Sequence, residues 1–181
     1  LRSRGITWKT IYDEKIGHTG SHFTIPIWDG VGRNRRLVGV KKRRDDHFPH
    51  DDDEPKYRLT AGSTPHLYRP NPSGKPLIVC EGEFDCLVLS QLGFDAVTTT
   101  GGAGSLPKIL RHAPLPSRGY LWVATDMDEA GDTAYTEMVK IFGSRCRRLR
   151  WDGGKDVSDA LTGMTLSRQR QVVERWMACR A

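Results

Sequence analysis

The alternation of apolar and polar positions changes character about a third of the way along the chain. Before residue 70, short alternating runs such as 22–27 and 37–40 are separated by Gly, Asn and Asp clusters typical of turns. Beyond it, apolar segments fit strand and helix in turn. Strands are predicted at 77–80, 96–100, 120–125 and 146–151, and helices at 83–92, 129–142 and 166–179.

Strands that alternate with helices favour an α/β fold, here a parallel sheet of about four strands with helices on both faces. A small basic α+β, strand-rich subdomain precedes it. Because residues 69–74 have the composition of a linker, we predict boundaries that give segments 1–73, 74–165 and a C-terminal helix over 166–181. The acidic segment 45–54 is too polar to pack and is predicted to be a mobile loop.

Composition narrows the class of protein without giving its function. The 181 residues are 37% hydrophobic, enough for one sizeable core or two small ones. No apolar run approaches the roughly 18 residues that span a bilayer, and no signal core is evident, so we expect a soluble, cytoplasmic protein with no membrane partner. The chain starts at Leu1 rather than Met, and we expect it to be a piece of a longer protein.

Two common kinds of site are absent from the sequence. The four cysteines lie too far apart for a zinc site built from local ligands, and they are expected to be small buried side chains. No GxxxxGK[ST] phosphate loop occurs, which excludes the commonest ATPase site from this chain.

Acidic residues follow three of the predicted strands, where ligands of parallel sheets bind. The clusters are Glu81 with Asp85, Asp126 with Asp128, and Asp156 with Asp159. An Asp before a helix is most often only an N-cap, but three clusters at one sheet edge would repel one another unless cations held them. Carboxylate oxygens are the ligands that Mg²⁺ or Mn²⁺ prefers, so the sequence predicts a metal site there. Three further acids, Glu83, Glu129 and Asp132, are interpreted as first-turn helix residues.

The three clusters occur in a characteristic order. The segments Val79–Asp85, Thr125–Gly131 and Gly154–Asp156 resemble the three motifs of the Toprim domain, in the form found in primases of phage primase-helicases and bacteria. The resemblance covers roughly residues 75–162. It implies the Rossmann-like Toprim fold and a DNA primase that makes short RNA primers on single-stranded DNA from NTPs, in the cytoplasm of a bacterial cell or a phage-infected host.

The resemblance also implies roles for the acidic residues. Glu81 would be the catalytic residue that handles the proton of the attacking 3′-hydroxyl. Asp126 and Asp128 would hold Mg²⁺ or Mn²⁺, with Asp85 and Asp156 completing or supporting the site. The third motif departs from the bacterial pattern, because Ser158 stands where a second aspartate is frequent. Asp159 is the residue that could compensate.

Most of the basic surplus lies in the first third of the chain. The net charge is +6, and residues 1–70 hold 14 basic and nine acidic residues. Seven of the twelve residues from Arg33 to Arg44 are basic, which is typical of a solvated face or of phosphate binding. By the same resemblance to primases, five of the basic residues would bind template or NTP: Lys41, Lys42, Arg43, Arg44 and Lys56.

Other features of the sequence give weaker evidence about function. The turn 101–105 could present N–H groups to phosphate, but its sequence favours a tight glycine turn, and the five tryptophans are expected mainly in the core. The six histidines have no ligand spacing and receive no role.

Two other functions stay open. A Toprim nuclease or topoisomerase-type enzyme would use the same carboxylates to cleave phosphodiesters. A non-catalytic DNA-binding module would not need to maintain a repulsive acidic cluster. If the chain is a primase core, its partners would include a replicative helicase, fused or recruited, and a zinc-binding template-recognition module outside this chain.

Overall fold

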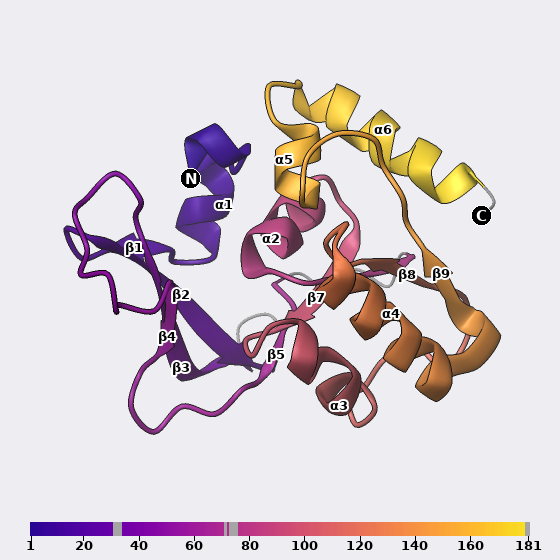
Figure 1. The fold of residues 1–181 in the computed structure, drawn as a ribbon, viewed down its shortest axis with the longest axis horizontal. Coiled ribbons are helices and arrows are strands. Elements are labelled where there is room, and N and C mark those ends of the chain that lie inside the picture. The colour runs from indigo at the N-terminus through magenta and orange to yellow at the C-terminus, as the bar shows by residue number, and fades with distance from the viewer. Residues whose placement is uncertain (31–33, 71, 73–75, 180–181) are drawn as a thin grey trace.

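The computed structural model describes residues 1–30, 34–70, 72 and 76–179 (Figure 1). Arg33 of the basic run and three residues of the predicted linker, Asn71, Ser73 and Gly74, lie outside these ranges. The described chain forms a four-stranded sheet in the order β1-β2-β3-β4 and a five-stranded sheet in the order β5-β7-β6-β8-β9.

The first sheet is built from the alternating runs near the N-terminus and is antiparallel throughout. Its long strands pair from His22 against Arg44 to Asp29 against Arg36, with an irregularity at Ile27 and Trp28. A 3₁₀ turn over Arg2–Arg4 and helix α1 (Trp8–Asp13) precede it. The strands are β1 (Gly17–His18), β2 (His22–Asp29), β3 (Arg36–Arg44) and β4 (Tyr57–Leu59).

The second sheet has four parallel strands, as predicted. They are β7 (Asp95–Thr99), β6 (Leu77–Cys80), β8 (Leu121–Ala124) and β9 (Cys146–Arg148). A fifth strand, β5 (Leu67–Tyr68), was not predicted, because two residues are too short to show a period. It adds to the edge antiparallel to β7.

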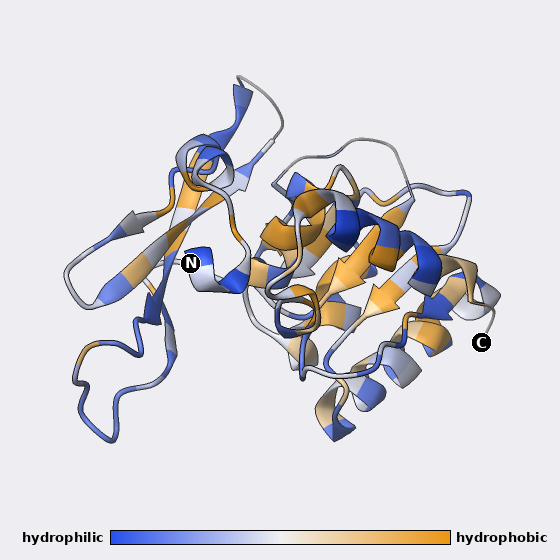
Figure 2. Cartoon of the chain, turned by 90° about the horizontal axis from the view of Figure 1, so that it is seen from above, coloured by the Kyte–Doolittle hydropathy of each residue, from blue (hydrophilic) through white to orange (hydrophobic). Residues whose placement is uncertain are grey.

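Helices cover both faces of the second sheet. The predicted helices form α2 (Glu83–Gln91), α4 (Glu129–Phe142) and α6 (Leu166–Ala178), and two short helices join them, α3 (Leu106–Leu110) and α5 (Val157–Leu161). Side chains of α2, α5 and α6 fill one core, and those of α3 and α4 fill the other. The central strands between them are strongly hydrophobic (Figure 2). None of the helices in the described ranges is long and apolar enough to cross a membrane.

The first third packs against the second sheet's unit. Ile6, Ile16 and Ile25 are buried in the same core as α2. Beside them, the Lys41 ammonium on β3 lies 2.6 Å from the Glu83 carboxylate at the start of α2, and both side chains are less than a tenth exposed. This buried ion pair joins the first sheet to α2, because each ion has left water and needs the other.

We expect Lys41→Met to lower the free energy of unfolding by about 3 kcal/mol, because Glu83 would be left buried without its counter-ion. Adding Glu83→Leu should recover part of that loss, and urea unfolding of the two single variants and the double variant measures the coupling. A Lys41→Met protein as stable as the parent would contradict a buried, mutually dependent pair.

Candidate functional site

The carboxyl ends of β6 and β8 open onto a cavity of about 730 Å³. Its wall contains six acidic side chains and also four basic ones, three of them from the first third of the chain. The acidic residues are Glu81, Glu83, Asp85, Asp126, Asp156 and Asp159, and the basic ones are Arg4, Lys41, Lys56 and Lys155. The fold therefore brings the predicted acidic edge together with part of the predicted basic surface.

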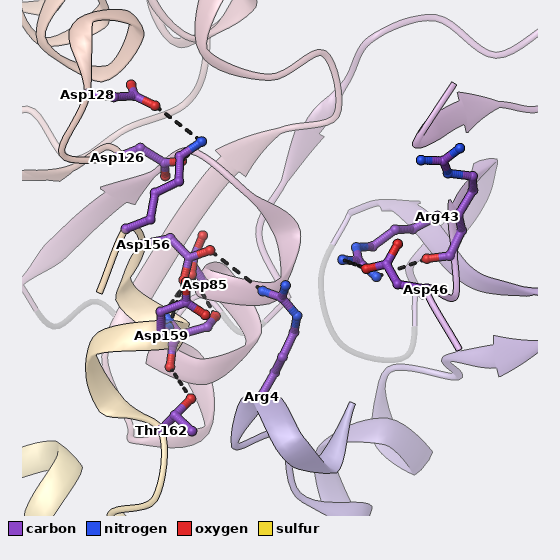
Figure 3. Close-up of polar contacts among 12 residues, drawn as sticks. Arg4, Arg43, Asp46, Asp85, Asp126, Asp128, Asp156, Asp159 and Thr162 are labelled. Atoms are coloured by element: carbon purple, nitrogen blue, oxygen red, sulfur yellow. Dashed lines mark hydrogen bonds and ion pairs between the residues drawn. The ribbon is translucent and has the colours of Figure 1, made fainter. Parts of the chain in front are cut away.

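Asp126 and Asp128 lie in the loop that follows β8 (Figure 3). The Lys155 ammonium lies 3.7 Å from the Asp126 carboxylate and 3.3 Å from that of Asp128. Asp128 is also the N-cap of α4, with its Oδ1 accepting from the Gly131 N–H at 3.0 Å. One Asp128 oxygen therefore caps the helix, while the other faces Lys155, where a cation is already favoured.

Two of the acids are held where ionisation is costly. Burial, with the charge of Glu81 nearby, raises the pKa of Asp126 to about 6. Burial also raises the pKa of Glu81, although the Asp126 N–H donates to its Oε2 at 3.3 Å. Asp128 behaves oppositely, because the Gly131 N–H holds its pKa below the usual range.

Asp85 lies deeper than the other predicted metal ligands. Its Oδ1 accepts from the Ser158 N–H at 2.9 Å and from the Ser158 hydroxyl at 2.6 Å, which leaves Oδ2 without these donors. Burial, then the charge of Asp156, raises the pKa of Asp85 to about 7. Ser158, which departs from the family's pattern, thus anchors Asp85. A second carboxylate at that position would face Asp85 at close range.

Asp156 begins α5 and faces the cavity. Its Oδ1 accepts from the Asp159 N–H at 2.7 Å, and its Oδ2 lies 3.6 Å from the Arg4 guanidinium. The side chain of Asp159 is exposed at the rim. Arg4, which the sequence did not single out, comes from the N-terminal 3₁₀ turn. A single arginine with no neighbouring motif gave no signal of this role.

Close packing fixes the loop that carries Asp126. A side chain at Gly131 would place its Cβ 2.1 Å from the Asp126 carbonyl oxygen, so only glycine lets the start of α4 approach the loop this closely. The buried Arg148 of β9 donates to the Asp126 carbonyl at 2.8 Å and to the Gly131 carbonyl at 3.3 Å, and it pairs with Asp132 at 3.1 Å. Sequence reasoning missed Arg148, which looks like one more basic residue in an Arg-rich strand.

The loop before α5 is tied to the same place. The Met127 N–H donates to the Lys155 carbonyl at 3.1 Å, which holds the second and third acidic segments side by side. Gly154 has φ +76°, and a Cβ there would lie 2.6 Å from the Ala160 nitrogen. Lys155 is thus delivered to the carboxylates by a turn that requires glycine.

The predicted basic residues do not all reach the cavity. Lys41 and Lys56 line it, although Lys41 is paired with Glu83. Arg43 is buried on the same face of β3 and pairs with Asp46 at 3.2 Å, beside a second cavity of about 520 Å³. Lys42 alternates to the other face of the strand.

Arg44 also points away from the cavity, and its guanidinium donates to the Glu54 carbonyl at 2.8 Å.

Two weaker expectations have mixed outcomes. The tryptophans were expected mainly in the core, which is wrong for Trp8, whose side chain is 70% exposed, whereas Trp151 is buried against Trp176. The turn at 101–102 does line the cavity, and Gly102 has φ +71°.

The donor set fits a hard divalent cation. The acids at the strand ends offer oxygen ligands only. Asp126 resists ionisation because it is partly removed from water and, in addition, has acidic neighbours. The lysine ammonium between Asp126 and Asp128 occupies a position that such a cation would share or take.

Comparison with known proteins agrees with this arrangement. Residues 78–161 match the family described as Toprim-like, so the predicted Toprim fold is confirmed for that segment, which contains all the acids of the cavity wall. No curated protein has a significant sequence match to the chain.

The whole chain resembles solved primase structures. It superposes on the primase fragment of the bacteriophage T7 primase-helicase protein with a TM-score of 0.74 at 20% identity, covering 97% of this chain and 72% of that one. The Aquifex aeolicus primase (zinc binding and RNA polymerase domains) gives a TM-score of 0.65 at 19% identity, covering 98% of this chain and 54% of that one. A DNA primase domain from Pseudomonas aeruginosa gives a TM-score of 0.63 at 21% identity, covering 95% of this chain and 69% of that one. The first third therefore shares the primase fold as well.

Replacing Arg148 with Met should lower the free energy of unfolding by about 2–4 kcal/mol, because the Asp126 carbonyl and Asp132 lose this donor and the Gly131 carbonyl keeps only the Thr125 hydroxyl. Divalent-cation affinity should also fall, since the Asp126 loop loses its support. Chemical unfolding and calorimetric titration with Mg²⁺ measure the two effects. Arg150→Met, two residues away and exposed, is the matched control, and equal behaviour of the two variants would contradict this role.

Without divalent cations, the contribution of Asp126 and Asp85 to stability should fall as pH rises from about 4 to 7. The folded chain keeps protons on Asp126 and Asp85 that the unfolded chain releases near pH 4, so deprotonation favours unfolding. The readout is the difference in this slope between the parent and Asp126→Asn, with exposed Asp152→Asn as control. Added Mg²⁺ should flatten the parent's slope, and a parent slope identical to that of Asp126→Asn would refute the raised pKa.

Proposed function

We propose that this chain is the RNA-polymerase core of a DNA primase, which makes short RNA primers on single-stranded DNA by metal-dependent nucleotidyl transfer from NTPs. The observation that carries the proposal is the shared cavity, in which an acidic strand edge and basic side chains of the first third face one another. Both parts also follow the fold of solved primases.

A magnesium or manganese ion would be held by Asp126 and Asp128, with Asp156 and the free oxygen of Asp85 completing or supporting the site. When bound, such an ion neutralises phosphate charge and lowers the pKa of an attacking hydroxyl. Lys155 holds the two aspartates in place without the ion, because it neutralises them and is fixed by the turn at Gly154.

Glu81 would act as the base. Burial raises its pKa toward the range in which a carboxylate accepts a proton effectively at neutral pH. It lies directly at the end of β6, beside the Asp126 N–H, so it is positioned by two parallel strands rather than by a flexible loop. The proton it would take is that of the primer's 3′-hydroxyl.

The basic side chains of the cavity would bind phosphate. Lys56 is exposed at the wall, and Arg4 reaches over the acidic edge to Asp156. Lys41, Lys42, Arg43 and Arg44 would contact template or triphosphate, with Lys41 and Arg43 first leaving their carboxylate partners. Such contacts give affinity that is independent of sequence and falls with salt.

In the cell, the core would work with other replication components in the bacterial or phage-infected cytoplasm. The bacteriophage T7 protein is named a primase-helicase, and the Aquifex structure contains a zinc-binding domain in addition. We infer a replicative helicase, fused or recruited, and a zinc-binding module that recognises template.

The test is primer synthesis on labelled single-stranded DNA with NTPs and Mg²⁺, with a zinc-binding module supplied in trans. Asp126→Ala and Glu81→Gln should each reduce synthesis by at least about 100-fold, because each removes a group that acts in the reacting centre. Glu129→Gln, an exposed acid three residues after Asp126, should leave it unchanged.

Circular dichroism confirms that each variant is folded before activity is compared. Full activity of a folded Asp126→Ala protein would refute the site. If the labelled DNA is shortened and no primers are extended, the chain is a Toprim nuclease instead of a primase. If calorimetry shows no Mg²⁺ binding, the result favours a non-catalytic DNA-binding module.

A further inference from the structure

A second cluster of ligand-type side chains lies in the first third, in the segment expected to be too polar to pack. Among the described residues, His22, His50 and Glu54 form the one group of three whose ligand atoms all lie within 4.8 Å of one another. Their side chains are only 16%, 9% and 19% exposed, so the expectation of an unpacked loop is wrong for this part. The polar groups pack because they satisfy one another.

The three side chains converge on one point. His22 Nε2 lies 3.2 Å from Glu54 Oε1, and His50 Nδ1 lies 3.0 Å from Glu54 Oε2. Ligands bound at about 2.0–2.1 Å to a tetrahedral ion are separated by roughly 3.3 Å. Each imidazole-to-carboxylate distance is close to that spacing. The two imidazoles face different oxygens of Glu54, so both would reach one ion if the carboxylate bound through both oxygens or turned slightly.

The outer partners of the two imidazoles are also in place. The second nitrogen of His50, Nε2, lies 2.9 Å from the Asp45 carbonyl oxygen, which can only accept, so Nε2 carries a hydrogen. Nδ1 of the neutral ring then carries a lone pair that faces a Glu54 carboxylate oxygen. Two such acceptors lie this close only with a proton or a metal ion between them. His22 Nδ1 lies 2.9 Å from the Ser21 hydroxyl. A ring N–H held by a carbonyl is the usual support of a metal-binding histidine.

We propose that His22, His50 and Glu54 bind a zinc-class divalent cation, with water as the fourth ligand. Two imidazoles and one carboxylate suit Zn²⁺ or Co²⁺, whereas the oxygen-only cluster at the strand ends suits Mg²⁺ or Mn²⁺. The chain would thus hold two cation sites of different chemistry, one in each unit.

The ion would anchor the loop that joins β3 to β4 against the start of β2. His22 is the first residue of β2, while His50 and Glu54 belong to the loop. Two positions after Glu54, the chain enters the cavity wall at Lys56 and Tyr57. Fixing the loop to β2 would therefore also fix the strand entry that carries Lys56.

The experiment is a titration of Zn²⁺ alone into chelator-stripped protein, by calorimetry in excess Mg²⁺, which keeps the acidic site occupied. A Cys179→Ser background removes the exposed thiol. The parent should bind one Zn²⁺ per chain, and Co²⁺ should give the visible absorption of four-coordinate nitrogen and oxygen ligation. His50→Ala and Glu54→Gln should each weaken binding by at least about 100-fold, more than the loss of an outer partner would.

His47→Ala is the matched control, because it lies in the same loop, contacts Asp45 and is 84% exposed. It should bind Zn²⁺ as the parent does. Hydrogen exchange over residues 45–56 should slow on Zn²⁺ addition in the parent and the control but not in His50→Ala. Glu54→Gln keeps the shape of the side chain, so it tests the site even if His50→Ala folds poorly.

Two results would overturn the proposal. The first is a parent that binds no Zn²⁺ in excess Mg²⁺, which would leave the cluster as a protonated imidazole paired with Glu54. The second is Zn²⁺ binding that His50→Ala and Glu54→Gln leave unchanged, which would place the ion elsewhere.

Discussion

Mutual repulsion among the carboxylates at the ends of β6 and β8 is the constraint on which the site depends. Parallel strands bring Glu81 and Asp126 to the same edge, and burial makes their charges hard to sustain, so their pKa values rise. Positive charge must come from elsewhere. Lys155 supplies it from the turn before α5, and Arg4 supplies it from the 3₁₀ turn near the N-terminus.

Holding the repulsive edge together requires rigid support from behind. The buried Arg148 binds backbone carbonyls at both ends of the Asp126 loop, and Gly131 allows α4 to begin directly against it. On the opposite side, Ser158 fixes Asp85 through two hydrogen bonds. These groups touch no reacting atom, yet they set the positions of those proposed to do so. A site of like charges therefore depends on neutral contacts and one buried arginine as much as on its acids.

The basic first third meets the same edge through alternation along β3. Adjacent residues of a strand point to opposite faces, so a run of four basic residues is divided in two. Lys41 and Arg43 turn inward to Glu83 and Asp46, while Lys42 and Arg44 turn to the other face. The net charge of +6 gave only the expectation of an acidic partner. The positions of the basic residues show that part of this charge is already neutralised by carboxylates of the same protein. To bind phosphate, Lys41 and Arg43 would have to exchange these carboxylate partners for phosphate oxygens.

The sequence by itself determined the parallel sheet, the long helices and the acidic residues at the strand ends, because buried strands and amphipathic helices leave a local period in the chain. It also determined the Toprim-like segment, since three short motifs in order are a local property. Only the tertiary structure decided which basic residues reach the cavity, that Arg148 supports the Asp126 loop, that β5 joins the second sheet, and that His22, His50 and Glu54 meet. Each of these rests on residues far apart in the chain or on strand faces, and no period or spacing records which distant side chains will meet once the backbone has folded.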